Sequence, residues 1–289
     1  MIDSKDDLFP LTRRRVLRAA AAASTTALFP TGPPRAAADE KAKRPLRPLV
    51  VAFDVIETLF DLSPLRDKLK EAGLPADALG AWFARMLRDA MALTITGVYK
   101  SFGDVAKGTL EVMLTEAKVA PKPNRVAAVL AGFAELPAHP DVAPAFERLR
   151  NAKVRVVTLT NGSAENTGAL LAGAKLKEMV ERTITVDEVK KWKPAKEVYL
   201  HAAEAVKVEP ARMALVAAHD WDCHGAIRAG LVAGFVARKG KGFHPAMDPP
   251  DIQGRVSVTF VGGHAGQVES DRCQNASHWP GSLRYSART

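Results

Sequence analysis

The feature that most constrains the fold is an apolar run that ends in a carboxylate, in the segment LVVAFDVIETLFD at residues 49–61. An apolar run bounded by polar residues is typical of a strand buried on both faces of a parallel sheet. Asp54 would follow this strand at its carboxyl end, the edge where open α/β sheets bind ligands. A poorly solvated, oriented carboxylate suits a nucleophile. The alternative is that Asp54 only caps the turn.

Later segments repeat the strand pattern in alternation with helical segments. We expect strands over 154–160, 184–186, 213–217 and 232–237, and helices over 144–151, 195–206 and 222–229. This alternation predicts an α/β fold with a doubly wound parallel sheet. No GxGxxG occurs, so a dinucleotide fingerprint is absent. We expect the core at 49–62 and 137–262, with a loose C-terminal tail at 263–289.

The segment between the first two strands has the pattern of helices. Ser63 and Pro64 suit an N-cap and a first turn. Large apolar residues then recur at the spacing of one helix face: Trp82, Phe83, Met86, Leu87, Ala90 and Met91. Further helices are expected over 102–117 and 124–134. An inserted helical domain at 63–136 is favoured over a long crossover, which needs far fewer residues.

The N-terminus has the features of a leader. The run TRRRVLR at 12–18 precedes a short apolar stretch, and Ala36-Ala37-Ala38 follows as a cleavage site. This order resembles a twin-arginine signal; a basic amphipathic arm or a short anchor is the alternative. We expect 1–38 to be a signal peptide and 39–48 a linker. The mature protein would then be periplasmic, with the twin-arginine export machinery as a partner.

Charge and cysteine content narrow the range of ligands. The formal net charge of +9 falls to +6 without the leader, which holds six basic and three acidic residues. A positive chain favours a small anionic substrate or an anionic surface. No basic helix with interleaved aromatics occurs, so nucleic acid is not an expected partner. Cys223 and Cys273 stand in unlike contexts and indicate no disulfide framework. A homodimer is compatible with this composition.

The Asp54 segment resembles the first motif of the haloacid dehalogenase superfamily, an apolar strand ending in Asp-x-x-x-Thr. Within that superfamily, FDVIETLFDL is most similar to the branch of the type II, L-2-haloacid dehalogenases. The resemblance extends over residues 49–254 and implies a helical cap inserted into the core. It makes Asp54 the nucleophile and Thr58 its hydrogen-bond partner. Phosphatases of the superfamily carry a second Asp where Ile56 stands, and isoleucine cannot move a proton.

Two further strand ends carry residues that the resemblance assigns to the site. Thr160 and Asn161 would hold an anionic part of the substrate, or else form a plain N-cap turn. Lys193, before a proline, would lie beside Asp54 and keep it ionised. A surface lysine before proline is the alternative. Tyr199 matches a family tyrosine.

The third strand end is the segment AAHDWDCHGA at residues 217–226. Asp222 takes the position of the family's last carboxylate, near the nucleophile and the lysine. His219 stands where the branch usually has asparagine, and we expect it to face the pocket and orient water or substrate; a helix cap is the alternative. Ala217 replaces a usual serine and would also be the place for a metal-binding acid. We therefore expect no metal and no cofactor. A transition-metal cluster here is disfavoured because side chains on such a turn diverge.

The cap should supply a cation for a carboxylate or a leaving halide. In the branch, an arginine directly follows a tryptophan, but Phe83 follows Trp82 here. We expect Arg85 or Arg88, one turn on, to substitute, because a guanidinium binds carboxylates in two-pronged fashion. A solvated surface arginine is the alternative for either.

The resemblance therefore implies a secreted, metal-independent hydrolase. Asp54 would displace halide from the α-carbon of a short 2-haloacid with inversion and form an ester. Water, oriented by Asp222 and His219, would cleave that ester at the aspartyl carbon. Hydrolysis of another small carboxylic acid or phosphate ester stays open. So does a catalytically weak periplasmic binding protein, since Ile56, Ala217 and Phe83 depart from the branch.

Overall fold

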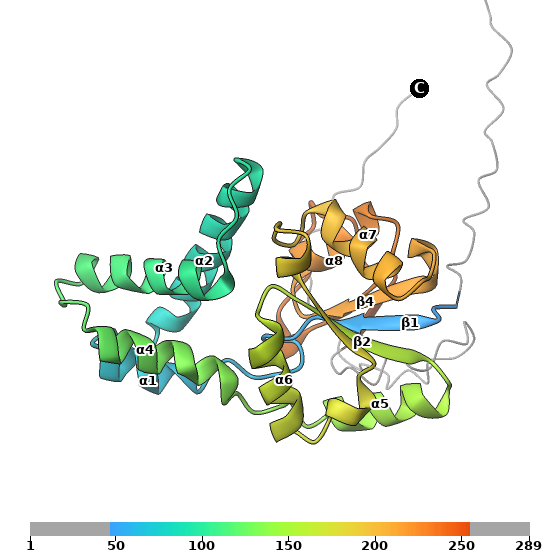
Figure 1. Cartoon of the computed structure of the whole chain (residues 1–289), viewed down its shortest axis with the longest axis horizontal. Helices are drawn as coiled ribbons and strands as arrows, with labels where there is room; N and C mark the ends of the chain where they lie inside the picture. The colour runs from blue at the N-terminus through green and yellow to red at the C-terminus, as the bar shows by residue number, and fades with distance from the viewer. Residues whose placement is uncertain (1–46, 255–289) are drawn as a thin grey trace, which may run out of the picture. The chain divides into compact units, whose positions relative to one another are not determined.

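The computed structural model describes residues 47–254, which contain one six-stranded parallel sheet (Figure 1). The strand order is β3–β2–β1–β4–β5–β6. The strands are β1 (Val50–Phe53), β2 (Arg155–Thr160), β3 (Arg182–Thr185), β4 (Met213–Ala217), β5 (Val232–Val236) and β6 (Ile252–Gly254). The predicted α/β class with a doubly wound parallel sheet is confirmed. The expected signal peptide, most of the linker and the C-terminal tail lie outside the described residues.

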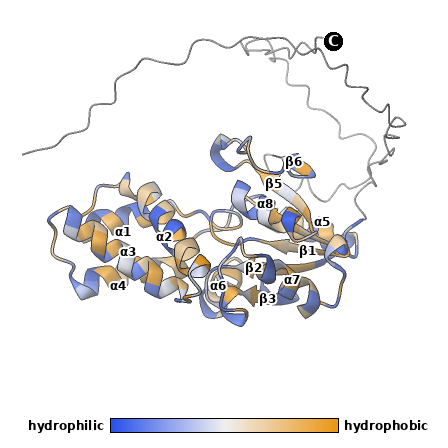
Figure 2. Cartoon of the chain, turned by 90° about the horizontal axis from the view of Figure 1, so that it is seen from above, coloured by the Kyte–Doolittle hydropathy of each residue, from blue (hydrophilic) through white to orange (hydrophobic). Residues whose placement is uncertain are grey.

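Helices cover both faces of the sheet, which explains why the central strands β1, β4 and β5 are buried and carry no charged or hydroxyl residue. Val51 and Phe53 of β1 share an apolar cluster with helices α5 (Val142–Asn151) and α6 (Ala164–Gly173). Val50 and Ala52 share a second cluster with helices α7 (Lys196–Ala205) and α8 (Asp220–Arg228). Successive residues of a strand face opposite sides, so one short strand supports two cores. Figure 2, coloured by residue hydropathy, shows apolar and polar residues mixed along the helices, as this arrangement requires.

The first four helices after β1 form a group of their own, which Figure 1 shows beside the sheet. They are α1 (Leu65–Ala72), α2 (Ala78–Ile95), α3 (Phe102–Glu116) and α4 (Pro123–Ala131); we call them the cap. The apolar stripe predicted for α2 is confirmed, because Trp82, Met86 and Ala90 are fully buried. The Trp82 indole N–H donates to the Ala106 carbonyl at 3.1 Å, which ties α2 to α3. None of the helices in the described part of the chain is long and apolar enough to span a membrane.

The cap joins the sheet through two segments that lie side by side. Phe60 and Ala138 form an antiparallel bridge, and the backbone of His139 donates to Leu59 at 2.9 Å. A second contact lies between the cap and the segment before α7. There the Trp192 indole donates to the Lys100 carbonyl at 3.0 Å, and the Trp192 backbone N–H donates to the Thr94 hydroxyl at 3.2 Å.

Several element boundaries differ from those predicted. β6 was not predicted, since its three residues carry no apolar run of their own. The Ser63 hydroxyl does not cap α1; it donates to the nearby Asp61 carboxylate at 2.5 Å, and α1 begins at Leu65. The helix α8 begins at Asp220, two residues earlier than expected. Short 3-10 turns complete the described chain: η1 (Gly132–Ala134), η2 (Lys177–Met179), η3 (Val186–Glu188), η4 (Pro210–Arg212) and η5 (Arg238–Gly240).

Candidate active site

The candidate site lies where three neighbouring strands end. β1 pairs with β2 on one side and with β4 on the other, so the residues that follow them meet at one edge of the sheet. Asp54 follows β1, Asn161 follows β2 and His219 lies just beyond β4. All three line one small pocket. The register of the parallel sheet therefore brings together residues that lie more than a hundred positions apart in sequence.

Asp54 is buried and both of its oxygens accept hydrogen bonds. The Lys193 ammonium donates to Oδ1 at 2.7 Å. The Thr58 hydroxyl donates to Oδ2 at 2.7 Å, and His219 Nδ1 lies 3.2 Å from the same oxygen. Burial alone would raise the pKa of Asp54, but the charge of Lys193 and the contact with His219 outweigh it and lower that pKa. The carboxylate is therefore ionised at neutral pH.

Lys193 is fully buried and uses all three ammonium N–H groups. They reach Asp54 Oδ1 at 2.7 Å, Asp222 Oδ2 at 2.7 Å and the Leu159 carbonyl at 2.9 Å. Burial would lower the pKa of this lysine, but the two carboxylates raise it. The ammonium is thus a fixed positive charge between two acids, which offsets much of the cost of burying them.

Asp222 completes this buried network. Its second oxygen, Oδ1, accepts from the Tyr199 hydroxyl at 2.6 Å, and the residue is fully buried. Burial and the neighbouring charge of Asp54 raise the pKa of Asp222 despite its contact with Lys193. Glycine is needed at 225 because a Cβ there would lie 2.6 Å from the Tyr199 oxygen. The helix α8 can therefore approach the tyrosine closely enough to place Asp222.

The Thr160-Asn161 turn organises the neighbouring loop. The Thr160 hydroxyl accepts from the Gly162 backbone at 2.9 Å. The Asn161 side-chain oxygen, Oδ1, accepts from the Lys193 backbone N–H at 3.0 Å, and Asn161 also lines the pocket. This turn is also an N-cap, because the Ser163 hydroxyl accepts from the Asn166 backbone at 3.1 Å. The N-cap of the turn is thus Ser163, while the holding of an anionic part of the substrate by Thr160 and Asn161 stays a prediction.

His219 bridges two carboxylates at the pocket. Its Nε2 lies 3.0 Å from Glu57 Oε2, while Nδ1 faces Asp54. The imidazole is stacked on Trp221, with ring centroids 5.2 Å apart. Burial would lower the pKa of His219, but the two carboxylates raise it to about 9. His219 is also the N-cap residue of α8 by position, although its side chain makes no capping bond.

Glu57 was not predicted as a site residue. Its backbone has φ 64, in the left-handed region where glycine is favoured, and it is the one non-glycine residue other than lysine with positive φ in the described chain. The signal available in the sequence was an acidic residue directly before Thr58, inside the first motif.

The cap supplies the apolar wall of the pocket. Phe83 and Leu87 of α2 and Phe102 of α3 line it opposite the polar residues. Its volume is about 20 Å³. Arg85 and Arg88 do not line it: Arg85 pairs with Glu116 at 2.6 Å, and Arg88 with Asp89 at 2.7 Å. Neither arginine therefore supplies the expected cation to the pocket in this structure, because each is held by an ion pair outside it.

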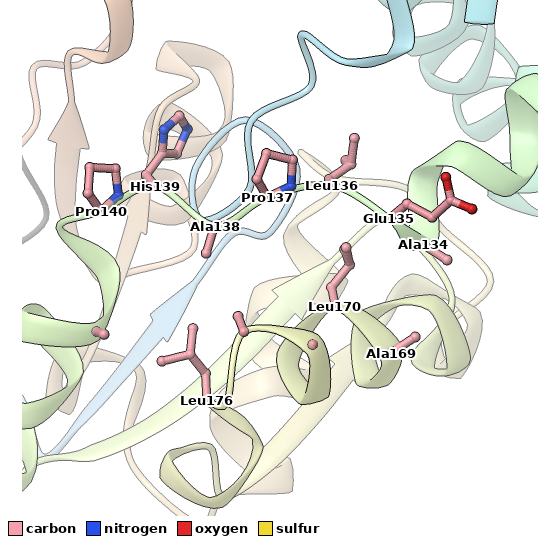
Figure 3. Close-up of a pocket in the computed structure, with 13 residues that line it drawn as sticks. Ala134, Glu135, Leu136, Pro137, Ala138, His139, Pro140, Ala169, Leu170 and Leu176 are labelled. Atoms are coloured by element: carbon pink, nitrogen blue, oxygen red, sulfur yellow. The ribbon is translucent and has the colours of Figure 1, made fainter.

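A larger pocket, of about 460 Å³, lies between α6 and the segment that leads from the cap to α5. Figure 3 shows Pro137, Ala138 and His139 on one side, with Leu170 and Leu176 on the other. None of the predicted site residues lines it. The larger of these two pockets is therefore not the one that the predicted site residues line.

The polar residues around the start of α8 point apart, as expected. Asp222 faces Lys193, the Cys223 thiol faces the Ala217 carbonyl at 3.9 Å, and His224 pairs with Asp248 at 3.5 Å. Within residues 47–254, no group of three or more His, Cys, Asp or Glu is arranged to hold a metal ion.

A parallel sheet with an inserted helical cap and an ionised aspartate held by a buried lysine is the arrangement of an aspartate-dependent hydrolase. The chain belongs to the haloacid dehalogenase-like hydrolases, whose family model matches residues 48–230.

Relatives of known activity fall mainly in one branch. The chain is 28% identical over 203 residues to (S)-2-haloacid dehalogenase 4A of Burkholderia cepacia, covering 70% of this chain and 85% of that protein. A solved L-2-haloacid dehalogenase of Xanthobacter autotrophicus, with chloropropionic acid covalently bound, superposes with a TM-score of 0.69 at 22% identity, covering 74% of this chain and 97% of that one. Another relative is a glyceraldehyde 3-phosphate phosphatase of Methanopyrus kandleri, 27% identical over 213 residues, covering 69% of this chain and 87% of that protein.

Proposed function

We propose that this protein hydrolyses the carbon–halogen bond of short 2-haloacids through an ester on Asp54. The observation that carries the proposal is the state of Asp54: ionised, held by Lys193 and Thr58, and lining the pocket. Such a carboxylate can attack without a base to activate it. The names of the relatives supply the substrate class, and the positive charge of the chain agrees with an anionic substrate.

In the first step an Asp54 oxygen attacks the α-carbon from the side opposite the halogen. The C–O bond forms as the C–halogen bond breaks, so the configuration at carbon inverts and halide leaves. Asn161, which lines the pocket before the α6 N-terminus, would hold the substrate carboxylate. Water then attacks the carbonyl carbon of the ester and releases the 2-hydroxy acid.

We also propose that the reaction needs no metal. A magnesium ion prefers free carboxylate and carbonyl oxygens. Both Asp54 oxygens already accept from Lys193, Thr58 or His219, and Ala217 offers no ligand. The donor set of this site therefore does not fit the ion that a phosphatase of the family would use.

Phosphate ester hydrolysis is the second candidate, and the Methanopyrus relative favours it. The side chain two residues after the nucleophile counts against it, because Ile56 lines the pocket and cannot protonate a leaving group.

The test is halide release by the purified protein with 2-chloropropionate, with and without chelator. We expect chelator-independent release, and loss of about three or more orders of magnitude in Asp54→Asn, which keeps the shape and removes the charge. In heavy-oxygen water, the peptide containing Asp54 should gain label over many turnovers. Label going straight to product, with Asp54 unlabelled, contradicts the ester. Binding of 2-chloropropionate without turnover indicates a binding protein, and magnesium-dependent phosphate release indicates a phosphatase.

Export to the periplasm by the twin-arginine machinery is likewise a proposal, based on Arg13 and Arg14. The double variant Arg13→Lys, Arg14→Lys should leave the precursor unprocessed in the cytoplasm. Its appearance in processed, periplasmic form contradicts the proposal.

A further inference from the structure

We infer that His219, held by Glu57, is the general base that cleaves the Asp54 ester. The inference rests on the proposed function and deepens it. In this reaction His219 is a catalytic residue, because it contacts the reacting group, and Glu57 is a positioning residue. Glu57 lies between Ile56 and Thr58, at a position that the Asp-x-x-x-Thr motif leaves unspecified, so the motif assigns it no role.

Asp222 cannot take this role in the geometry observed. One of its oxygens accepts from Lys193 and the other from Tyr199, at 2.7 and 2.6 Å. It is fully buried and does not line the pocket. A general base must lie within hydrogen-bond reach of the water it deprotonates. His219 lines the pocket and lies beside Asp54, so it meets that condition.

The two imidazole nitrogens have different partners, which defines what each can do. Nε2 faces Glu57 Oε2 at 3.0 Å and therefore keeps its proton in both charge states. Nδ1 faces Asp54 Oδ2 at 3.2 Å. When Nδ1 has lost its proton, its lone pair faces the Asp54 carboxyl group, and a water beside that group can donate to it.

Esterification changes the charge that His219 experiences. In the resting site, the Asp54 carboxylate keeps Nδ1 protonated. Alkylation turns that carboxylate into a neutral ester and expels halide with its electron pair. The Nδ1 proton then goes to solvent, so acid appears together with halide.

The second half-reaction restores the resting state. Neutral His219 takes one proton from the attacking water as the water oxygen bonds to the Asp54 carbonyl carbon. The ester C–O bond breaks, and the second water proton ends on the departing hydroxyl group. The site is again Asp54 carboxylate and His219 imidazolium, and one proton and one halide have been released per turnover.

Glu57 is fixed in place from several sides. Its backbone N–H donates to the Phe60 carbonyl at 2.9 Å, and its own carbonyl accepts from His139 Nε2 at 3.3 Å. Its backbone has a left-handed conformation, which glycine adopts without strain and glutamate does not. The Lys241 ammonium lies 3.4 Å from the Glu57 carboxylate.

The surroundings of His219 contain few charged groups. Glu57 and Asp54 are the carboxylates that contact it. Lys241 contacts Glu57, and Lys193 contacts Asp54. The remaining neighbours are aromatic: Trp221 of α8, and Phe83 of the cap with ring centroids 6.2 Å apart. Loss of the Asp54 charge therefore strongly weakens the electrostatic stabilisation of the protonated His219 imidazole.

The experiment is rapid-quench kinetics with 2-chloropropionate as the probe. Wild-type protein should release halide continuously. His219→Gln, which keeps a polar side chain but neither a base nor the asparagine usual in the branch, should release about one halide per site in a burst and then turn over about 10²–10⁴-fold more slowly. Its Asp54 peptide should carry the mass of the trapped ester. Glu57→Gln should slow the same step less. The matched control is His201→Asn, because His201 forms a 3.0 Å pair with Glu188 away from the site and should leave both steps unchanged.

Three outcomes overturn the inference. Steady turnover of His219→Gln close to the wild-type rate is one. Loss of turnover without the halide burst and the trapped ester is another, and it indicates a structural role only. Absence of halide release by wild-type protein overturns the proposed function and the inference with it.

A wild-type measurement tests the same point if a variant does not fold. The rate of ester breakdown should rise with pH through a histidine titration, while ester formation, which needs no base, should not. Breakdown that is independent of pH overturns the inference.

Discussion

The floor and the wall of the pocket differ in how their side chains are held. The floor is a buried network in which Lys193 joins Asp54 and Asp222, and every polar group has partners. The wall, from α2 and α3, consists of Phe83, Leu87 and Phe102, which only pack. A hydrogen-bonded network tolerates almost no substitution, whereas an apolar wall can change shape at modest cost. The floor therefore fixes the chemistry, and the wall is free to set which substrate enters.

The largest expected effect comes from removing the charge at the centre of the floor. Lys193→Met leaves two buried carboxylates facing each other, so we expect a loss of about 3–5 kcal/mol in unfolding free energy. Halide release should fall by about three orders of magnitude or more, because the pKa of Asp54 rises. Denaturant unfolding and rapid-quench assays measure both. The control is Lys191→Met, which breaks only the exposed pair with Glu197. Equal effects at the two positions contradict the network.

The floor should also lose stability at high pH. The folded pKa of His219, about 9, lies above its ordinary value of 6.5, so its contribution is complete below 6.5 and disappears as pH rises through about 9. The amount is up to about 3 kcal/mol. The difference in unfolding free energy between wild type and His219→Asn should shrink over that window. A difference that stays constant from pH 6 to pH 10 would count against the charged pair.

A truncation in the wall should change selectivity more than stability. Leu87 is half-buried, so Leu87→Ala should cost only about 1–2 kcal/mol, less than a fully buried leucine. The larger pocket should lower the KM for 2-haloacids with longer chains and leave ester breakdown unchanged. Single-turnover and steady-state kinetics on 2-chloropropionate and 2-chlorobutyrate separate the change in KM from any change in the rate of ester breakdown. Leu200→Ala, on the exposed side of α7, is the control. A fall in the breakdown rate for both acids would show that the wall shares in the chemistry.

The smallest effect is expected at the two arginines of α2. Arg85 and Arg88 form exposed ion pairs outside the pocket, and such pairs contribute about 1 kcal/mol or less. Arg85→Ala and Arg88→Ala should therefore leave KM within about twofold and stability nearly unchanged. A large rise in KM for either variant would show that its guanidinium reaches the substrate when the cap moves.

The floor could be predicted from the sequence far better than the wall. Strand ends are marked by apolar runs, and parallel register then brings Asp54, Lys193 and Asp222 together. Thr58 and Tyr199 follow from the same motifs and make the contacts described for them. The resemblance to the superfamily motifs assigned these residues, and the register of the parallel sheet explains why the motifs meet at one edge.

The wall of the pocket, and Glu57 beside the floor, depend on contacts that no local pattern encodes. Helical spacing places Arg85 on α2, but its direction is decided by Glu116 on another helix. Glu57 adopts a left-handed backbone without being glycine, so the usual signal for that conformation is missing. β6 pairs with β5 through backbone bonds at three residues that show no strand pattern. Tertiary partners decide all three.

The size of the pocket has a consequence for timing. A volume of about 20 Å³ admits about one water molecule, which is far less than a 2-haloacid needs. For a substrate of the proposed class we therefore expect the cap to open, with the contacts of Trp192 to Lys100 and Thr94 separating about the paired segments at Phe60 and Ala138. Such motions take microseconds to milliseconds. Substrate capture should then slow as solvent viscosity rises, which makes viscosity a variable of the kinetics.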